Sequence, residues 1–359
     1  MGMLSIISSA KFLRHTNYFY LTAAFWLASF TGCATMNPID PKSPEHHTET
    51  GFRNLFIESK TKGFGDMWKW KVSGEGPRGS DTDRKSVPRV DVDQASLNKP
   101  GSAPQVTWIG HSTVLFQMAG KTVITDPVFS DRCSPVSFAG PKRYQAPALS
   151  VAELPKVDFA VISHNHYDHL DKASVIAMGK EVHWLVPLGL KSWFNDLGIE
   201  RVTELDWWAE TTLSDVRFVA TPTQHWSARG LADQFETLWA SWLVEIDGVR
   251  FWFGGDTGYN DIQFKEIGKR FAPIDIAAIP IGAYEPRWFM KDMHVNPEEA
   301  LNIHEDIGAR WSFGVHWGTF QLTDEAPLDP RKDLLKFRDQ KGLSEDEFTT
   351  LAIGETQTR

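Results

Sequence analysis

Short segments of apolar and β-branched residues, separated by polar turns, run through the chain from residue 105 onward. The segments at 106–109, 113–118 and 121–126 predict three strands, and the glycine turn at 119–120 joins the last two into a hairpin. Segments of the same character predict further strands at 157–162, 182–186, 216–220, 238–246, 249–253 and 274–281.

Helices are predicted between the later strands, at 173–178 and 190–197. A third helix begins at Asn296, which supplies an N-cap, because Pro297 suits the first helical position and acidic residues fill the first turn. Strands that come first in hairpins and later alternate with helices predict an α/β sandwich in which helices cover two packed sheets.

Residues 34–103 differ in composition from the rest of the chain, because they are rich in Pro, Gly, Ser and charge. This composition indicates a linker and N-terminal extension without a core of its own, followed by a folded domain over 104–359. His46 and His47 are expected to be solvated in the linker. The exception is 64–71, where aromatic residues interleave with lysines. We expect this segment to dock on its own domain, with contact to a membrane surface as the alternative.

The first 33 residues have the pattern of a bacterial signal peptide. Lys11 and Arg14 precede an apolar run over 18–30, which is shorter than the roughly 20 apolar residues of a membrane-spanning helix. Small residues stand just before Cys33, as in a lipobox, so Cys33 is expected to be the lipidated first residue of the mature chain. Ordinary cleavage or an uncleaved anchor is the alternative. A lipid anchor predicts the bacterial cell envelope, as an outer-membrane lipoprotein facing the periplasm or anchored to the inner membrane.

Composition and charge narrow the classes of function. The 359 residues are 42% hydrophobic, which is enough for a substantial core, and the net charge of −9 argues against a nucleic-acid-binding scaffold. If Cys33 carries lipid, Cys133 is left as a single thiol and no intrachain disulfide is available. Stability must then come from the core and from bound metal.

Candidate metal ligands concentrate in 162–171, at the end of the predicted strand over 157–162. Four of them fall within six residues: His164, His166, Asp168 and His169. Imidazole nitrogens and carboxylate oxygens are usual ligands of Zn²⁺, and burying several of them without a partner costs a few kcal/mol each. Their density predicts a metal site on a loop at a strand end.

Three more candidate ligands stand at strand ends, each with Gly or Pro nearby to turn the chain: His225, Asp256 and His316. With the first four they make seven ligands, which suits two sites of three ligands each and one shared carboxylate. The sequence therefore predicts two Zn²⁺ ions per chain, and spacing alone leaves open which ligand serves which ion.

The order of these residues, His164-x-His166-x-Asp168-His169 followed by His225, Asp256 and His316, resembles the metallo-β-lactamase superfamily. Longer strings resemble its N-acyl-phosphatidylethanolamine-hydrolysing phospholipase D family: WIGHST at 108–113, DPVFS at 126–130, GPKR at 140–143 and IPIGAYEPRWFM at 279–290. The resemblance covers about residues 105–325. It implies a four-layer αββα sandwich with the metals at one edge between the sheets.

The resemblance also implies the ligand sets: His164, His166 and His225 for one zinc, Asp168, His169 and His316 for the other, and Asp256 as the bridge. His294, just before the capped helix, matches a family histidine that faces the substrate, as a hydrogen-bond donor or acid near a phosphate. Tyr167 and His111 are candidates for the shell around metals and substrate.

The function implied is phospholipase D-type hydrolysis of N-acyl-phosphatidylethanolamine to N-acylethanolamine and phosphatidic acid, with Asp168 orienting the attacking water. Expected partners are a phospholipid and, through the anchor, a membrane surface; a homodimer is one expected assembly, and no nucleic acid is expected. A lactonase or β-lactamase is the alternative, because the fold does not select the substrate. An envelope protein with structural zinc is the alternative of another class, although structural zinc favours closed, Cys-rich sites.

Overall fold

The computed structural model describes residues 43–57, 64–73, 76, 78–230 and 232–359. The predicted signal peptide and Cys33 lie outside the described residues. Ile39–Arg359 form one compact unit. Among the described residues, every helix is too short or too polar to pass through a bilayer.

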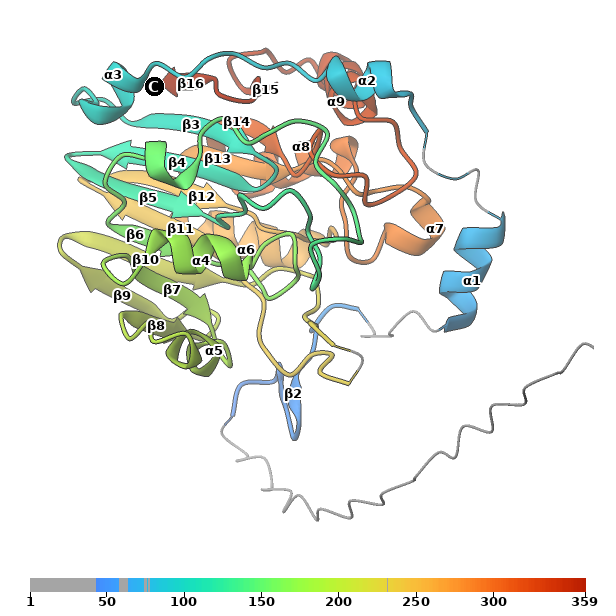
Figure 1. Ribbon diagram of the computed structural model, residues 1–359, viewed down its shortest axis with the longest axis horizontal. Coiled ribbons are helices and arrows are strands. Elements are labelled where there is room, and N and C mark those ends of the chain that lie inside the picture. Colours follow the sequence, from blue (N-terminus) through green and yellow to red (C-terminus); the bar gives the residue numbers. More distant parts are fainter. Residues whose placement is uncertain (1–42, 58–63, 74–75, 77, 231) are drawn as a thin grey trace, which may run out of the picture. The chain divides into compact units, whose positions relative to one another are not determined.

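Two seven-stranded sheets form the centre of this unit (Figure 1). The first sheet has the order β16-β3-β4-β5-β6-β7-β8. Its strands are β3 (Gln105–Gly110), β4 (Thr113–Met118), β5 (Lys121–Thr125), β6 (Phe159–Val161), β7 (His183–Pro187), β8 (Val202–Leu205) and β16 (Thr356–Thr358). Neighbouring strands pair antiparallel from β16 to β5 and parallel from β5 to β8.

The second sheet has the order β15-β14-β13-β12-β11-β10-β9 and the same mixed character. Its strands are β9 (Glu210–Leu213), β10 (Val216–Thr221), β11 (Ser241–Ile246), β12 (Val249–Phe253), β13 (Ile274–Pro280), β14 (Ala309–Val315) and β15 (Phe348–Thr350). A small hairpin of β1 (His47–Thr48) and β2 (Gly51–Phe52) precedes both sheets. Each large sheet is parallel in one half, where the carboxyl ends of successive strands point to the same edge.

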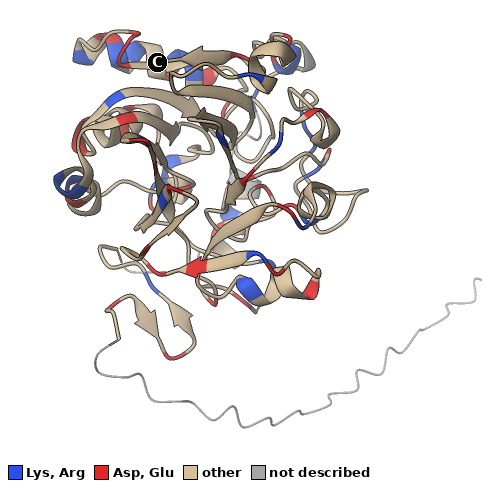
Figure 2. Cartoon of the chain, turned by 90° about the vertical axis from the view of Figure 1, so that its left-hand side faces the viewer, with Lys and Arg blue, Asp and Glu red and all other residues tan. Residues whose placement is uncertain are grey.

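The helices are short and mostly follow the strands of the parallel halves. They are α1 (Phe64–Ser73), α2 (Asp81–Lys85), α3 (Gln94–Asn98), α4 (Lys172–Met178), α5 (Lys191–Asp196), α6 (Asp261–Phe271), α7 (Arg287–Met290), α8 (Pro297–Asp306) and α9 (Asp329–Lys341), with a 3₁₀ turn at Val151–Glu153. Acidic and basic residues are interspersed over these elements in the view of Figure 2.

Alternate residues of a strand face opposite sides of its sheet, and this alternation builds the layers. In β4, Val114 and Phe116 belong to the core between the sheets, whereas Leu115 belongs to a second core outside them. The Phe116 ring stacks on Phe251 of the other sheet, with 4.8 Å between centroids. Helices complete both outer sides, through Val175 of α4 and Phe194 of α5 on the first sheet, and through Phe264 of α6, Leu301 of α8 and Leu334 of α9 on the second. The predicted αββα sandwich is confirmed.

The predicted strands are present, but two of them begin later than predicted. The strand expected over 157–162 begins at Phe159. The strand expected over 238–246 begins at Ser241, because the residues before it bond elsewhere. Leu238 N–H donates to the Leu188 carbonyl and Ala240 N–H donates to the Ser163 carbonyl, each at 2.9 Å. The three predicted helices appear as α4, α5 and α8, and Asn296 caps α8 through a reciprocal bond with Glu299.

The described part of the N-terminal extension packs onto the sandwich. In α1, the Trp70 indole donates to Asp324 at 2.8 Å, and its ring lies 5.0 Å from the ring of Phe289. Val87 belongs to the core between the sheets, and Leu97 belongs to the core outside the first sheet. Docking of the 64–71 segment on its own domain, as expected from its sequence, is therefore confirmed for Trp70, whereas Met67 and Trp68 are exposed.

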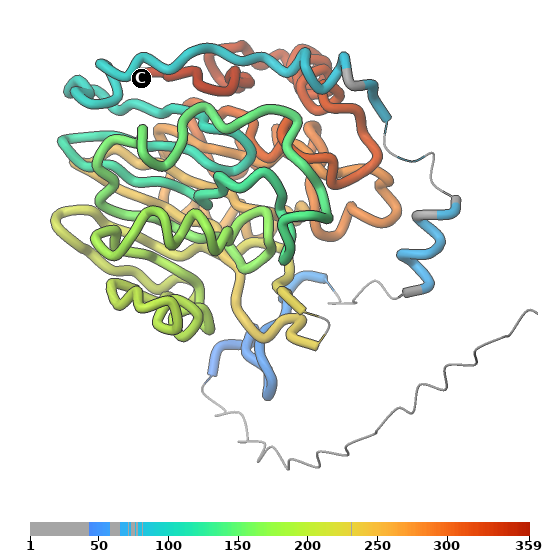
Figure 3. The backbone as a smooth tube through the Cα atoms, in the orientation of Figure 1, coloured from blue at the N-terminus to red at the C-terminus, as the bar shows by residue number. Residues whose placement is uncertain are grey.

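The expectation that His46 and His47 are solvated is wrong. The hairpin of β1 and β2 turns both imidazoles toward the carboxylate of Asp206, which follows β8. The backbone of the hairpin is also bonded to the loop after β10, because Phe52 N–H donates to the Phe235 carbonyl at 2.9 Å. Figure 3 shows this early segment, in blue, beside the yellow loop that contains Phe235. Composition alone did not reveal this contact, because it joins residues far apart in the sequence.

Candidate metal centre

The seven predicted ligands converge at one edge of the two sheets. Each follows a strand: the His164–His169 group follows β6, His225 follows β10, Asp256 follows β12 and His316 follows β14. Their ligand atoms fall into overlapping groups in which all atoms lie within 4.8 Å of one another. The groups join residues from both sheets, so the site depends on the packing of the sandwich.

The loop after β6 is a compact turn. His169 and Leu170 N–H both donate to the His166 carbonyl, at 3.1 and 2.9 Å. Asp171 then caps α4 by accepting from Ala173 N–H. The turn explains how four ligands from six residues can face one place without an extended backbone.

Three imidazoles form the first subsite. His164 Nε2 lies 2.7 Å from His166 Nδ1, and His225 Nε2 lies 3.3 Å from the same nitrogen. Burial lowers the pKa of His164 and His225 well below the ordinary value, and it lowers the pKa of His166 to about 4. All three rings are therefore neutral at neutral pH, which is the protonation state that ligates a metal.

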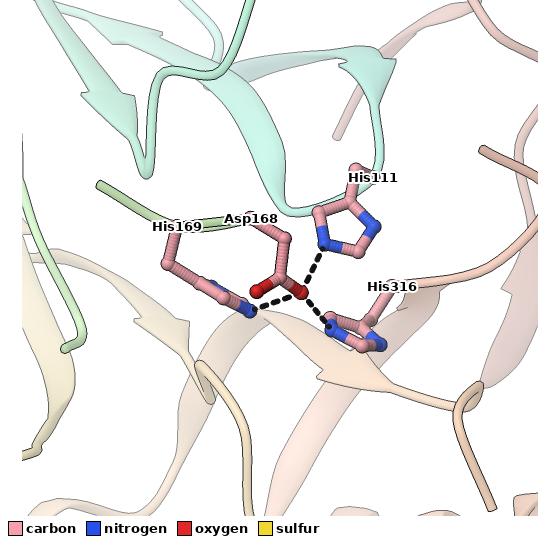
Figure 4. Close-up of side chains that lie close together, drawn as sticks. All are labelled: His111, Asp168, His169 and His316. Carbon is pink, nitrogen blue, oxygen red and sulfur yellow. Dashed lines mark hydrogen bonds and ion pairs between the residues drawn. The ribbon is translucent and has the colours of Figure 1, made fainter. Parts of the chain in front are cut away.

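The second subsite surrounds the carboxylate of Asp168 (Figure 4). Asp168 Oδ2 lies 3.1 Å from His111 Nε2, and it lies 3.3 Å from the Nε2 atoms of His169 and His316. Burial opposes ionisation of Asp168, but the charge of His169 and hydrogen bonds from its neighbours hold its pKa well below the usual value. The predicted ligands Asp168, His169 and His316 thus lie together, with His111 added to them.

Asp256 lies between the two subsites. Its Oδ1 is 3.1 Å from His316 Nε2, whereas its Oδ2 is 3.2 Å from His169 Nε2 and 3.8 Å from His225 Nε2. Burial opposes protonation of His316, but Asp256 and Asp168 outweigh it and raise its pKa to about 9. The buried carboxylate of Asp256 and the partly buried carboxylate of Asp168 therefore give the centre a negative field that attracts cations.

The residues present fit a pair of divalent cations. His169 Nε2 and Asp256 Oδ1 are buried within ion-pair distance of neighbouring ligand atoms, but neither makes a well-oriented hydrogen bond among the described residues, and such atoms are costly to bury. The donor set of imidazole nitrogen and carboxylate oxygen suits Zn²⁺ and other first-row ions. The two oxygens of Asp256 face both subsites, which is the arrangement that the predicted bridging role requires.

Sequence reasoning gave Asp126 no role, but the structure places it directly behind a ligand. It follows β5, and its Oδ2 lies 2.6 Å from His169 Nδ1, while its Oδ1 accepts from Ser163 N–H at 2.7 Å. An acceptor at Nδ1 keeps the proton there and leaves Nε2 available for a metal. The available signal was an aspartate at the end of a buried strand.

His111 is buried in the centre, whereas Tyr167 lies in the wall beside it. His111 has φ of 55°, and its N–H donates to Thr319 Oγ1 at 2.8 Å. The Tyr167 hydroxyl donates to the Arg229 carbonyl at 3.0 Å, and the Arg229 guanidinium covers the Tyr167 ring. We infer that His111 supports the metal ligands through Asp168, while Tyr167 shapes the cavity.

An open cavity of about 430 Å³ leads to the metal ligands. Asp168, Asp256 and His294 contribute polar groups to it. Most of the remaining wall is apolar, and it includes Met67, Trp70, Phe235, Phe289, Met290 and Leu322. The arrangement suits a ligand with a polar reacting group and a large apolar portion.

His294 is held in the cavity wall by its backbone. Its N–H donates to the Met290 carbonyl at 2.9 Å, and its carbonyl accepts from Arg287 Nη1 at 2.8 Å. His294 Nδ1 lies 3.8 Å from Asp256 Oδ2, beyond hydrogen-bonding distance. Burial lowers the pKa of His294 to about 4, so its ring is neutral at neutral pH. The structure brings it beside the metal ligands, as predicted.

Comparison with known proteins agrees with this geometry. The model of the Beta-lactamase superfamily domain matches residues 121–317. Over 263 residues the chain is 46% identical to N-acyl-phosphatidylethanolamine-hydrolyzing phospholipase D 1 of Caenorhabditis elegans, which covers 69% of this chain and 74% of that protein. It is 40% identical over 236 residues to the mitochondrial N-acyl-phosphatidylethanolamine-hydrolyzing phospholipase D of Saccharomyces cerevisiae, over 64% of this chain and 50% of that protein.

Other relatives are bacterial or are similar in fold. An uncharacterized protein of Mycobacterium tuberculosis is 42% identical over 255 residues, covering 69% of this chain and 66% of that protein. Among solved structures, a possible metal-dependent hydrolase from Veillonella parvula has a TM-score of 0.58 at 19% identity, over 72% of this chain and 100% of that one. The family model and the nematode relative carry the assignment. The chain belongs to the metallo-β-lactamase superfamily and, within it, to the family of the N-acyl-phosphatidylethanolamine-hydrolysing phospholipases D.

Proposed function

We propose that this metal-dependent hydrolase is a zinc enzyme of the phospholipase D type that cleaves N-acyl-phosphatidylethanolamine into N-acylethanolamine and phosphatidic acid. The observation that carries the proposal is the cavity, whose largely apolar wall leads to the carboxylates and imidazoles of the metal centre. A lipid phosphodiester also has an apolar part and a polar part, so its acyl chains would lie beside the apolar wall and its phosphate beside the metal centre. The 46% identity to the nematode enzyme of that name supports the same substrate class.

Each part of the site has a role in the proposed reaction. The imidazoles and carboxylates of the centre would hold two cations, which when bound would supply an acidified water and neutralise charge on the phosphodiester. The Asp168 carboxylate accepts a hydrogen bond from the attacking water and aligns it toward phosphorus. His294 donates a hydrogen bond from its neutral ring to the phosphate or the leaving oxygen. The apolar wall excludes bulk water and so strengthens these polar contacts.

The proposed chemistry predicts a ranking of substrates. We expect turnover of N-acyl-phosphatidylethanolamine to exceed hydrolysis of β-lactams and simple lactones by orders of magnitude, because a phosphodiester presents two oxygens to the centre. Purified protein at equal zinc loading should be assayed on these substrates and on unacylated phosphatidylethanolamine, with product masses measured. Faster hydrolysis of a carbonyl substrate would replace the proposed function and leave the family assignment intact.

Apolar side chains are exposed on segments that also line the cavity. Trp68 of α1 is 62% exposed, beside Met67 in the cavity wall, and Trp288 of α7 is 45% exposed, beside Phe289. Phe138 is 82% exposed in a loop whose Cys133 and Pro141 also line the cavity. We propose that these rings enter the surface of a phospholipid bilayer, so that a substrate lipid reaches the cavity without crossing water.

This contact can be tested without turnover. Trp68→Ser with Phe138→Ser should weaken binding to vesicles of non-hydrolysable diether phospholipid by 10-fold or more, because each ring would lose roughly 1.5–3 kcal/mol of apolar burial. Ile176→Ser with Ile262→Ser is the matched control, since both residues are more than half exposed and neither lines the cavity. Equal vesicle binding by the two double variants would contradict the contact. Activity on a soluble short-chain substrate should be unchanged in both.

We also propose that a lipid on Cys33 tethers the enzyme to the bacterial envelope. The proposed location is the outer membrane, with the enzyme facing the periplasm, and the alternative is the inner membrane. The support is the sequence pattern of residues 11–33. Labelling cells with a tagged fatty acid should mark the wild type, whereas Cys33→Ala should carry no label and leave the membrane fraction. A wild-type chain that retains Met1 would rule the tether out.

A further inference from the structure

A second group of metal-type ligands lies outside the catalytic centre. His46 Nε2 is 2.6 Å from Asp206 Oδ1, and His47 Nε2 is 2.8 Å from Asp206 Oδ2. The three ligand atoms lie within 4.8 Å of one another. The histidines come from the start of the hairpin of β1 and β2, whereas the aspartate follows β8, so the group joins the N-terminal extension to the sandwich.

The packing around these three residues is closer to that of a metal-binding site than to that of an ion pair on the surface. His46 is 4% exposed, and its ring stacks on Trp207 with 4.4 Å between centroids. The Phe52 ring packs edge-on against His47 at 5.1 Å. Trp207 N–H also donates to Asp206 Oδ1 at 2.8 Å, which fixes the carboxylate. An apolar shell around imidazole and carboxylate ligands is a common feature of metal sites, because it limits solvent access.

The distances between ligand atoms in this group can be compared with those in the catalytic centre. There, ligand atoms assigned to a common cation approach to 2.7 Å for His164 and His166 and to 3.3 Å for His169 and Asp168. The 2.6 and 2.8 Å contacts of Asp206 are of similar length. Ligands on one tetrahedral ion are somewhat farther apart, so the side chains at either place need only move outward by a fraction of an ångström to bind one.

We propose that His46, His47 and Asp206 form a third cation site, for Zn²⁺ or a similar divalent ion, separate from the catalytic pair. Two imidazole nitrogens and one carboxylate leave a coordination position for water, and His47 is the side that faces solvent. A cation binds to the tautomer in which the two Nε2 atoms that face the carboxylate carry no proton.

The cation would fasten a segment that touches the catalytic centre. After the hairpin, Asn54 Nδ2 donates to the carbonyl of the metal ligand His225 at 2.8 Å. Phe52 N–H donates to Phe235, a residue of the cavity wall. Gly51 is packed so closely that a Cβ there would lie 2.1 Å from the Phe235 carbonyl oxygen. Binding at the third site thus stabilises the hairpin where it supports His225 and the wall of the cavity.

The test is the number of zinc ions retained by the full chain. After dialysis into a zinc-buffered solution, elemental analysis should find three ions per wild-type chain and two in His46→Gln with His47→Gln. Glutamine keeps an N–H donor for Asp206 but removes the imidazole ligands, so a hydrogen-bonded clamp would survive the change. His183→Gln is the control, because His183 is also a partly buried histidine. It bonds Thr203 of the neighbouring strand and belongs to neither group of metal-type ligands. It should keep all three ions.

The wild-type count is decisive even if the double variant folds poorly. Two ions in the wild type, or three in the double variant, would overturn the third site and leave the cluster as a hydrogen-bonded clamp. Asp206→Asn should also bind one ion fewer than the wild type. When Co²⁺ replaces zinc, the absorption of the ion at the third site should be present in the wild type and missing in the double variant. Since these readouts do not use turnover, they stand apart from the test of the proposed substrate.

Discussion

Asp256→Ala is expected to lose both catalytic cations and to reduce phosphodiester turnover by roughly 10³-fold or more. Asp256 is 2% exposed, and its two oxygens face ligands of both subsites, including His316 and His225. Alanine removes charge from both subsites at once, whereas loss of any one histidine affects a single subsite. Elemental analysis and activity should be measured on the same preparation, with circular dichroism to confirm the fold.

Asp261→Ala is the matched control for this change. Asp261 lies five residues farther along, at the start of α6, where its side chain is 63% exposed and pairs with Lys265 at 3.1 Å. Its loss should change neither metal content nor turnover. Retention of two ions by Asp256→Ala would mean that this carboxylate does not bridge, and the shared ligand would have to be sought at Asp168.

Several strands predicted correctly from sequence are strongly buried, but burial alone was not sufficient, because α6 was missed although five of its residues are buried. Every residue of β3 and β4 is buried, and α8 begins with an Asn cap and a proline. By contrast, α9 was missed, because its thirteen residues are mostly charged and only Pro330 and Leu334 are buried among them. The edge strand β9 was also missed, since its residues are exposed or half exposed and carry little apolar signal.

The metal ligands were predictable because four of them are close in sequence and the others follow strands. Their supporting residues were less visible. Asp126 is one of many aspartates after a strand, and only the fold brings it to His169 Nδ1. Asn54 lies in a polar segment 171 residues from His225, whose carbonyl it bonds. Local pattern can identify a residue type suited to metal, but contacts across such distances follow from tertiary packing.

His294→Ala is expected to retain both catalytic cations while turnover falls roughly 10²-fold. His294 lines the cavity, and its backbone is fixed by Met290 and Arg287 independently of the metal ligands. Its Nδ1 is, however, near enough to Asp256 and His225 for a ligand role to compete with a substrate role. Metal content separates the two roles, because a ligand is needed for occupancy and a hydrogen-bond donor to the phosphate is not.

His294→Gln sharpens the same test. The neutral ring of His294 is expected to donate a hydrogen bond, and the glutamine amide can also donate one, so this variant should recover a large part of the lost turnover. A group that transfers a proton would not be replaced in this way, and His294→Gln would then be as slow as His294→Ala. Loss of a cation from His294→Ala would make His294 a ligand, and unchanged turnover in both variants would leave it without a role in the reaction.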